Sequence, residues 1–254
     1  MDDKQAFLAS SWRSFWDEPP SPPSELPAAP DSISGQITGG IATLQPSSWL
    51  ESLICRLFQA DTNKVRLRYN GMCCLSLPEL MVVAIMSSSL HVTYTDQRSA
   101  STPAELFKLL SGMAAFDVNL FLTLQYLVGM GWRCCDGSKY GANLVAYSRH
   151  RTHSMYCVTV SRNPCLILAP SRSPAPAPPI VQLLQPRAQL LDIIAAQRVA
   201  EASMKACMLA HVAMPSSSSS SDLAHVLSSC EVLLLPVNRA RVDVAGDDAD
   251  LDAL

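Results

Sequence analysis

The chain has 254 residues, of which 48% are hydrophobic and 16% are charged, and its formal net charge is −3. This balance excludes a wholly disordered chain and predicts two small folded domains with flexible pieces. The apolar runs 80–86 and 120–130 are too short to span a bilayer, so no membrane segment is expected. The nine cysteines show no CxxC or Cys/His ligand spacing, which favours free thiols and predicts no metal site.

Residues 1–45 are expected to form a disordered tail. They open acidic and become proline- and serine-rich at 19–23, a composition typical of disorder. The aromatic side chains of Trp12, Phe15 and Trp16 stand at near-helical spacing within the tail. This cluster is a candidate docking helix for a partner.

Residues 46–115 are predicted to form a small N-terminal α/β domain. Ser76-Leu-Pro-Glu79 and Thr102-Pro-Ala-Glu105 both have the spacing of a capping box, with proline near the helix start. Asn70-Gly71 is a strong signal for a two-residue hairpin turn. The expected elements are a helix at 47–58, a hairpin of strands 65–69 and 72–77, a strand at 91–94, and helices that begin after Ser76 and Thr102.

Residues 116–242 are predicted to form a second domain, which begins with a helix at 116–130 and a strand at 132–135. Two segments rich in β-branched and aromatic residues follow, 143–147 and 153–160, and the polar gap between them suits a hairpin loop. Tyr147 and His153 flank this loop. Paired strands would therefore bring both side chains to one pocket at the end of the sheet.

A single helix is expected from Pro186 to about Ala213. Arg198 and Lys205 are seven residues apart in it, almost two helical turns, so both are predicted to share one face. A final apolar strand is expected at 231–237. Low-complexity loops are expected at 172–179 and 215–221, and an acidic tail at 243–254.

Three sequence blocks stand in order along the second domain. They are Gly-x-Lys-Tyr-Gly-x-x-Leu-x-x-Tyr ending at Tyr147, His-Ser-x-Tyr-x-Val beginning at His153, and Arg-Val-Ala-x-x-x-x-Lys ending at Lys205. Together they resemble the catalytic domain of tRNA-splicing (tRNA-intron) endonucleases, and most of all the eukaryotic subunit that cuts the 5′ splice site. The resemblance covers roughly residues 60–245. It implies an α+β fold, in which a small N-terminal α/β domain precedes a restriction-endonuclease-like mixed sheet flanked by helices.

The resemblance implies a catalytic triad of Tyr147, His153 and Lys205. Such a site cleaves RNA without metal or cofactor, through attack by the neighbouring 2′-hydroxyl, and leaves a 2′,3′-cyclic phosphate and a 5′-hydroxyl. A histidine can carry a proton at neutral pH and deliver it to the leaving oxygen. A fixed cation stabilises the charge of the transition state. Candidate RNA-binding residues are Arg149, Arg151, Arg187 and Arg198.

Each triad residue also has a structural interpretation. Tyr147 alone fits a strand aromatic, His153 fits a partly buried histidine, and Lys205 fits a helix ion pair with Glu201 four residues earlier. The three ordered blocks favour the catalytic interpretation of all three residues.

The resemblance also implies partners, namely precursor tRNA, a second catalytic subunit and two structural subunits, together with a nuclear location. It suggests that the last strand pairs with a partner subunit. Residues 139–241 carry ten Lys and Arg against four Asp and Glu, a balance that suits phosphate binding. Two alternatives stay open: the paralogue that cuts the 3′ splice site, and a non-catalytic structural subunit of the same complex.

Overall fold

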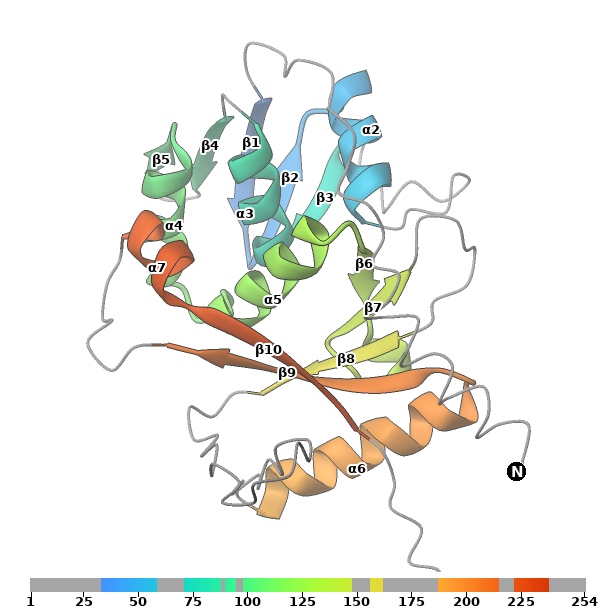
Figure 1. Cartoon of the computed structure of the whole chain (residues 1–254). Helices are drawn as coiled ribbons and strands as arrows, with labels where there is room; N and C mark the ends of the chain where they lie inside the picture. The colour runs from blue at the N-terminus through green and yellow to red at the C-terminus, as the bar shows by residue number, and fades with distance from the viewer. Residues whose placement is uncertain are drawn as a thin grey trace, which may run out of the picture.

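A computed structural model describes residues 33–58, 71–87, 90–94, 98–147, 156–161, 187–214 and 222–237. Within these residues the chain forms six α-helices and two mixed five-stranded sheets, so the α+β class is confirmed (Figure 1). No helix in this part of the chain is long and apolar enough to cross a membrane.

The first sheet has the strand order β3-β2-β1-β4-β5, and β1 and β4 are its parallel pair. Its helices begin at the predicted capping boxes, where the Glu79 carboxylate accepts a hydrogen bond from the Ser76 N–H at 3.0 Å and the Thr102 hydroxyl accepts one from the Glu105 N–H at 3.2 Å. The elements are β1 (Ile33–Thr38), β2 (Ile41–Leu44), α2 (Ser48–Leu57), β3 (Cys73–Ser76), α3 (Leu77–Met86), β4 (Leu90–Tyr94), β5 (Ser99–Ala100) and α4 (Pro103–Ser111).

The first two strands correct the prediction that residues 1–45 are all disordered. β1 and β2 form an antiparallel hairpin inside that stretch. Gly39 and Gly40 join them with φ angles of 58° and 87°, the left-handed conformation that a tight hairpin turn requires. The apolar residues of this segment alternate as in a strand, but the proline- and serine-rich residues before β1 led to the prediction of disorder for the whole stretch. Its buried side chains are Ile33, Ile37, Ala42 and Leu44.

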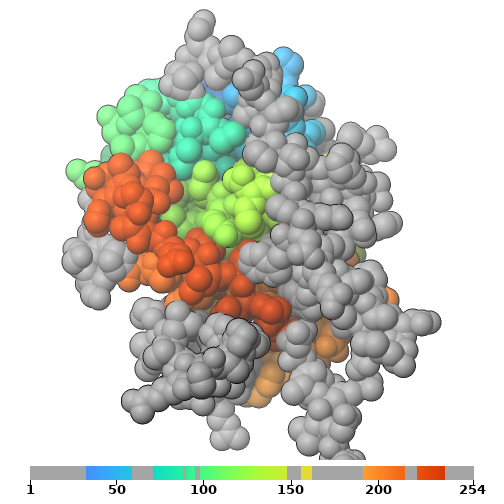
Figure 2. Space-filling view, viewed as in Figure 1, coloured from blue at the N-terminus to red at the C-terminus, as the bar shows by residue number. Residues whose placement is uncertain are grey.

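The second sheet has the strand order β10-β9-β8-β7-β6, and β8 and β9 are its parallel pair. The predicted hairpin at Tyr147 is confirmed as the antiparallel pair β7 and β8. β10 is an edge strand, and Figure 2 shows it with α7 in orange-red on the face in view. The elements are α5 (Val118–Gly129), β6 (Arg133–Asp136), the 3₁₀ turn η1 (Ser138–Tyr140), β7 (Leu144–Tyr147), β8 (Tyr156–Val160), α6 (Arg187–Ala202), β9 (Ala206–Ala213), α7 (Leu223–Ser229) and β10 (Glu231–Pro236).

The prediction of one helix from 186 to 213 is wrong, because α6 ends at Ala202 and β9 follows. The helix stops in a motif with Met204 at φ 54°. The Lys205 N–H donates to the Ala200 carbonyl at 2.9 Å and the Met204 N–H donates to the Glu201 carbonyl at 3.1 Å, the bonding pattern of a Schellman cap. Glycine usually occupies the position that Met204 takes here. Because this chain has no glycine there, the sequence does not indicate that the helix ends.

Two helices cover the second sheet, α5 on one face and α6 on the other (Figure 1). Alternate residues of β7, β8 and β9 therefore enter two different apolar clusters. One cluster is continuous with the core of the first sheet and contains Tyr156, whose ring meets that of Trp132 edge-on at 5.2 Å between centroids. Because both faces are buried, the strands are apolar nearly throughout.

Several predicted segments lie outside the described residues. They are the Trp12 to Trp16 cluster, the strand at 65–69, the loops 172–179 and 215–221, and the tail 243–254.

Phe121→Ala is expected to lower the free energy of unfolding by about 3–5 kcal/mol, the usual cost of removing a buried aromatic ring. The Phe121 ring is fully buried and lies 6.0 Å from that of Phe107 and 5.9 Å from that of Phe116. Urea denaturation measures the change. The control is Leu191→Ala on α6, where the side chain is 60% exposed and a change within about 0.5 kcal/mol is expected. Equal effects of the two substitutions would contradict this description of the core.

Candidate active site

Strand register places Tyr147 and Lys205 on one face of the second sheet. Ala146 on β7 pairs with Tyr156 on β8, and Tyr156 pairs with Ala206 on β9. The paired residues Ala146, Tyr156 and Ala206 form one row across the three strands. Tyr147 follows Ala146 on β7 and Lys205 precedes Ala206 on β9, and because β7 and β9 run in opposite directions, both residues lie one position from this row on the same side. Their backbones are two strand spacings apart, or roughly 10 Å. Residues 58 positions apart in sequence are thus brought to one end of the sheet, on the side that α6 covers.

Lys205 is a buried cation held against an aromatic ring. Its side chain is only 8% exposed, and its Nζ lies 4.8 Å from the centre of the Tyr140 ring. Tyr140 ends the turn η1, which Gly141 closes in the left-handed conformation at φ 64°. The Nζ of Lys139 lies 5.7 Å from the centre of the same ring. Such contacts between a cation and a ring face are attractive, and more so away from water.

Tyr147 is half-buried at the edge of a small cluster under α6. Its hydroxyl oxygen accepts a weak hydrogen bond from the Cys135 thiol at 3.8 Å. The buried members of this cluster are Ala142, Val145, Cys157, Ala200 and Cys207.

Two buried thiols stand on the same face of the sheet as Tyr147 and Lys205. Cys157 and Cys207 are direct partners across β8 and β9. Burial raises the pKa of the Cys157 thiol to about 11, against the opposing effect of the Lys205 charge. Burial, with smaller contributions from Cys157 and Glu201, raises the pKa of the Cys207 thiol to about 12. Both thiols therefore stay protonated at neutral pH and carry no charge near Lys205.

An alkaline pH is expected to lower the free energy of unfolding through these two thiols. Their folded-state pKa values lie above the ordinary 9.0, so the folded chain holds protons that the unfolded chain releases. Their contribution is complete below pH 9 and is lost as pH rises toward 11 and 12, by up to about 1.4 kcal/mol per pH unit for each thiol. Urea denaturation from pH 8 to pH 11 measures this loss. The double variant Cys157→Ala, Cys207→Ala should show a shallower decline than Cys55→Ala, and equal slopes would contradict the assignment.

The other predicted site residues have different outcomes. His153, Arg149 and Arg151 lie outside the described residues, and Arg187 is the first residue of α6. Arg198 is exposed on α6. The prediction that it shares a helix face with Lys205 is wrong, because Lys205 follows the helix. The face of α6 that meets the sheet carries Ile193, Ala196, Gln197 and Ala200.

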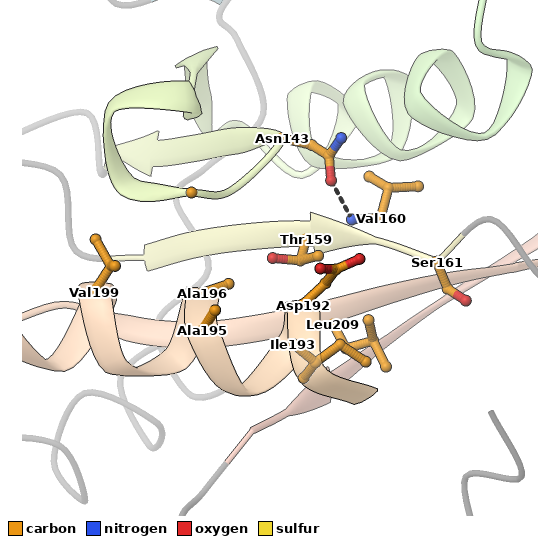
Figure 3. Close-up of a pocket in the computed structure, with 11 residues that line it drawn as sticks. Asn143, Thr159, Val160, Ser161, Asp192, Ile193, Ala195, Ala196, Val199 and Leu209 are labelled. Carbon is orange, nitrogen blue, oxygen red and sulfur yellow. Dashed lines mark hydrogen bonds between the residues drawn. The ribbon is translucent and has the colours of Figure 1, made fainter. Parts of the chain in front are cut away.

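A pocket of about 420 Å³ opens between α6 and the far end of β8 (Figure 3). It is separate from Tyr147 and Lys205, which stand at the opposite end of that strand. Asn143 braces one wall, where its Oδ1 accepts a hydrogen bond from the Val160 N–H at 2.8 Å. No sequence motif predicts this pocket, since Thr159 and Asp192, two of its polar residues, belong to no recognisable pattern.

Within the part of the chain that the structure describes, no group of three or more His, Cys, Asp or Glu side chains is placed to hold a metal ion. His211 on β9 is a buried histidine. Its burial lowers its pKa, and its Nδ1 has no hydrogen-bond partner among the described residues. It therefore stays neutral at physiological pH.

No protein-family model matches this chain, and no curated protein matches it in sequence. The resemblance to tRNA-splicing endonucleases therefore rests on the three sequence blocks. The structure describes all of the first block and of the third, and the second from Tyr156 onward. Family membership and activity are accordingly proposals.

Proposed function

We propose that this chain is a catalytic subunit of a tRNA-splicing endonuclease that cuts precursor tRNA at the 5′ splice site. The observation that carries the proposal is the convergence of Tyr147 and Lys205 on one face of the sheet. The two residues flank the start of β8, the strand that follows the segment carrying His153. An arrangement of this kind suits a site whose three groups come from separate parts of the chain.

The chemistry assigns one role to each group. Tyr147 takes the proton of the 2′-hydroxyl, and that oxygen attacks the adjacent phosphorus. His153 gives a proton to the departing 5′-oxygen. Lys205 favours loss of the phenolic proton and stabilises the added negative charge on the phosphorane. The bond from phosphorus to the 5′-oxygen breaks, which leaves a 2′,3′-cyclic phosphate and a 5′-hydroxyl.

Burial of Lys205 supports this assignment. A cation removed from water acts more strongly on nearby charge than one on the surface. The ring of Tyr140 lies against it, and the protonated thiols of Cys157 and Cys207 add no negative charge on this face of the sheet. A surface ion pair with Glu201 would not need such an environment.

The second sheet, with α5 and α6 on its two faces, is proposed to be restriction-endonuclease-like. The proposal includes a nuclear complex with a second catalytic subunit and two structural subunits. Among the described residues β10 is an edge strand that pairs with β9 alone, and we infer that its outer edge joins such an assembly, since exposed edges readily pair with other chains.

The test is cleavage of an intron-containing precursor tRNA by the assembled complex in the presence of a metal chelator. The expected products are an excised intron and exons with a 2′,3′-cyclic phosphate and a 5′-hydroxyl, mapped by end-specific labelling. Cleavage that requires Mg²⁺, or 3′-hydroxyl ends at the cut sites, would rule the mechanism out.

A further inference from the structure

The pocket between α6 and β8 combines an apolar lining with polar groups that can form hydrogen bonds to a ligand. Figure 3 shows the Asp192 side chain rising from α6 toward β8, where Thr159 also faces the pocket. The Thr159 Oγ1 is buried and has no hydrogen-bond partner among the described residues. A buried hydroxyl without a partner is costly, which points to a ligand that completes it. The apolar lining that α6 and β9 supply consists of Ile193, Ala195, Ala196, Val199 and Leu209.

This lining selects a class of ligand. An aspartate carboxylate accepts hydrogen bonds, and a threonine hydroxyl can either donate or accept. Apolar walls with a few convergent polar groups are typical of small-molecule sites, and about 420 Å³ falls within the usual range of roughly 300–1,000 Å³. A ligand with an apolar, flat body and an amino group at its edge satisfies both kinds of surface.

We propose that this pocket binds a nucleobase that carries an exocyclic amino group. The choice of a nucleobase among amino-bearing heterocycles rests on the proposed function. Thr159 lies three residues beyond Tyr156 on β8, about 10 Å from the row next to Tyr147 and Lys205. The bound base would therefore belong to a nucleotide near the cleaved bond but not at it.

The helix also offers a cation for the phosphate of such a nucleotide. Arg198 is exposed on α6, and Ala195, three residues before it, lines the pocket. Residues three apart are neighbours on a helix surface. The pocket would thus take the base, while Arg198 contacts the backbone that leads away from it.

The test uses free mononucleotides and needs no cleavage. The isotope-labelled full chain is titrated with AMP, CMP, UMP and ribose 5-phosphate, and backbone amide shifts are followed by NMR. AMP and CMP are expected to shift the amides of Thr159, Ala195 and Ala196. UMP, which has a carbonyl where CMP has its exocyclic amino group, is expected to bind at least tenfold more weakly than AMP and CMP. Ribose 5-phosphate, which has no base, should not shift these amides.

Two substitutions test the polar groups. Asp192→Asn and Thr159→Val are each expected to weaken AMP binding at least tenfold. Thr123→Val is the matched control, because the Thr123 hydroxyl is also buried without a hydrogen-bond partner in the described part of the chain but lies in α5, away from the pocket. Glu231→Gln controls for the loss of an exposed carboxylate elsewhere.

Equal binding of UMP and AMP, or unchanged binding by both pocket variants, would overturn the proposal. Failure here is distinguishable from failure of the proposed function. Splice-site cleavage without nucleotide binding rejects the pocket proposal alone, and AMP binding at Thr159 without cleavage upholds it while rejecting the endonuclease activity.

Discussion

Lys205→Met is expected to reduce cleavage at one splice site by about 10²- to 10³-fold, the range found when a preorganised electrostatic group is removed from a reacting centre. Methionine keeps the apolar stem that packs beside Tyr140 and removes the charge. The ground-state complex should be affected little, so kcat should fall more than KM rises. Single-turnover cleavage of precursor tRNA by the assembled complex measures the change.

Lys139→Met is the matched control for Lys205→Met. Its Nζ lies over the same Tyr140 ring, 5.7 Å from the ring centre, but η1 leaves it exposed. Cleavage is expected to stay within a few-fold of the wild type in this variant. Urea denaturation of both variants separates a folding defect from a chemical one. Normal cleavage by a folded Lys205→Met chain would remove this residue from the mechanism.

His153→Ala is expected to abolish one of the two cuts in precursor tRNA and to leave the other intact. Loss of a general acid costs about 10²- to 10⁴-fold in rate. The products are separated by electrophoresis and their ends are mapped, so that each splice site is scored independently. Loss of the 5′ cut supports the proposed assignment.

The other outcomes of this experiment are equally informative. Loss of the 3′ cut would identify the chain as the paralogous catalytic subunit. Two unaffected cuts would identify it as a structural subunit that retains the triad without using it. His225→Ala is the control, because His225 is exposed on α7 and lies outside the three sequence blocks.

Local patterns in the sequence predicted several elements well. The capping boxes at Ser76 and Thr102 set the starts of α3 and α4, because side-chain and backbone groups within one turn satisfy each other wherever the helix lies. The β7 and β8 hairpin followed from residue type and a short connection. Tyr147 and Lys205 were both selected from sequence blocks, and the structure places them on one face.

Other features depend on contacts between distant segments. Residues 206–213 are apolar except for His211 and suit either a helix or a strand. They form a strand because β8 and β10 supply hydrogen-bond partners on both edges. The helix stop at Met204 carries no glycine signal. For the same reason, the sequence could not show that Arg198 is exposed while Lys205 is buried.

The sequence by itself determined the α+β class, the capped helices and the residue types of the candidate site, since these depend on short-range chemistry. Only the tertiary structure decided how far α6 extends, where Lys205 stands relative to Tyr140, and that a pocket opens at Thr159 and Asp192. Each of these depends on strand register and on helix packing, which join residues far apart in the chain. A one-residue change of register would turn Tyr147 and Lys205 to opposite faces, and no local pattern in the sequence specifies that pairing.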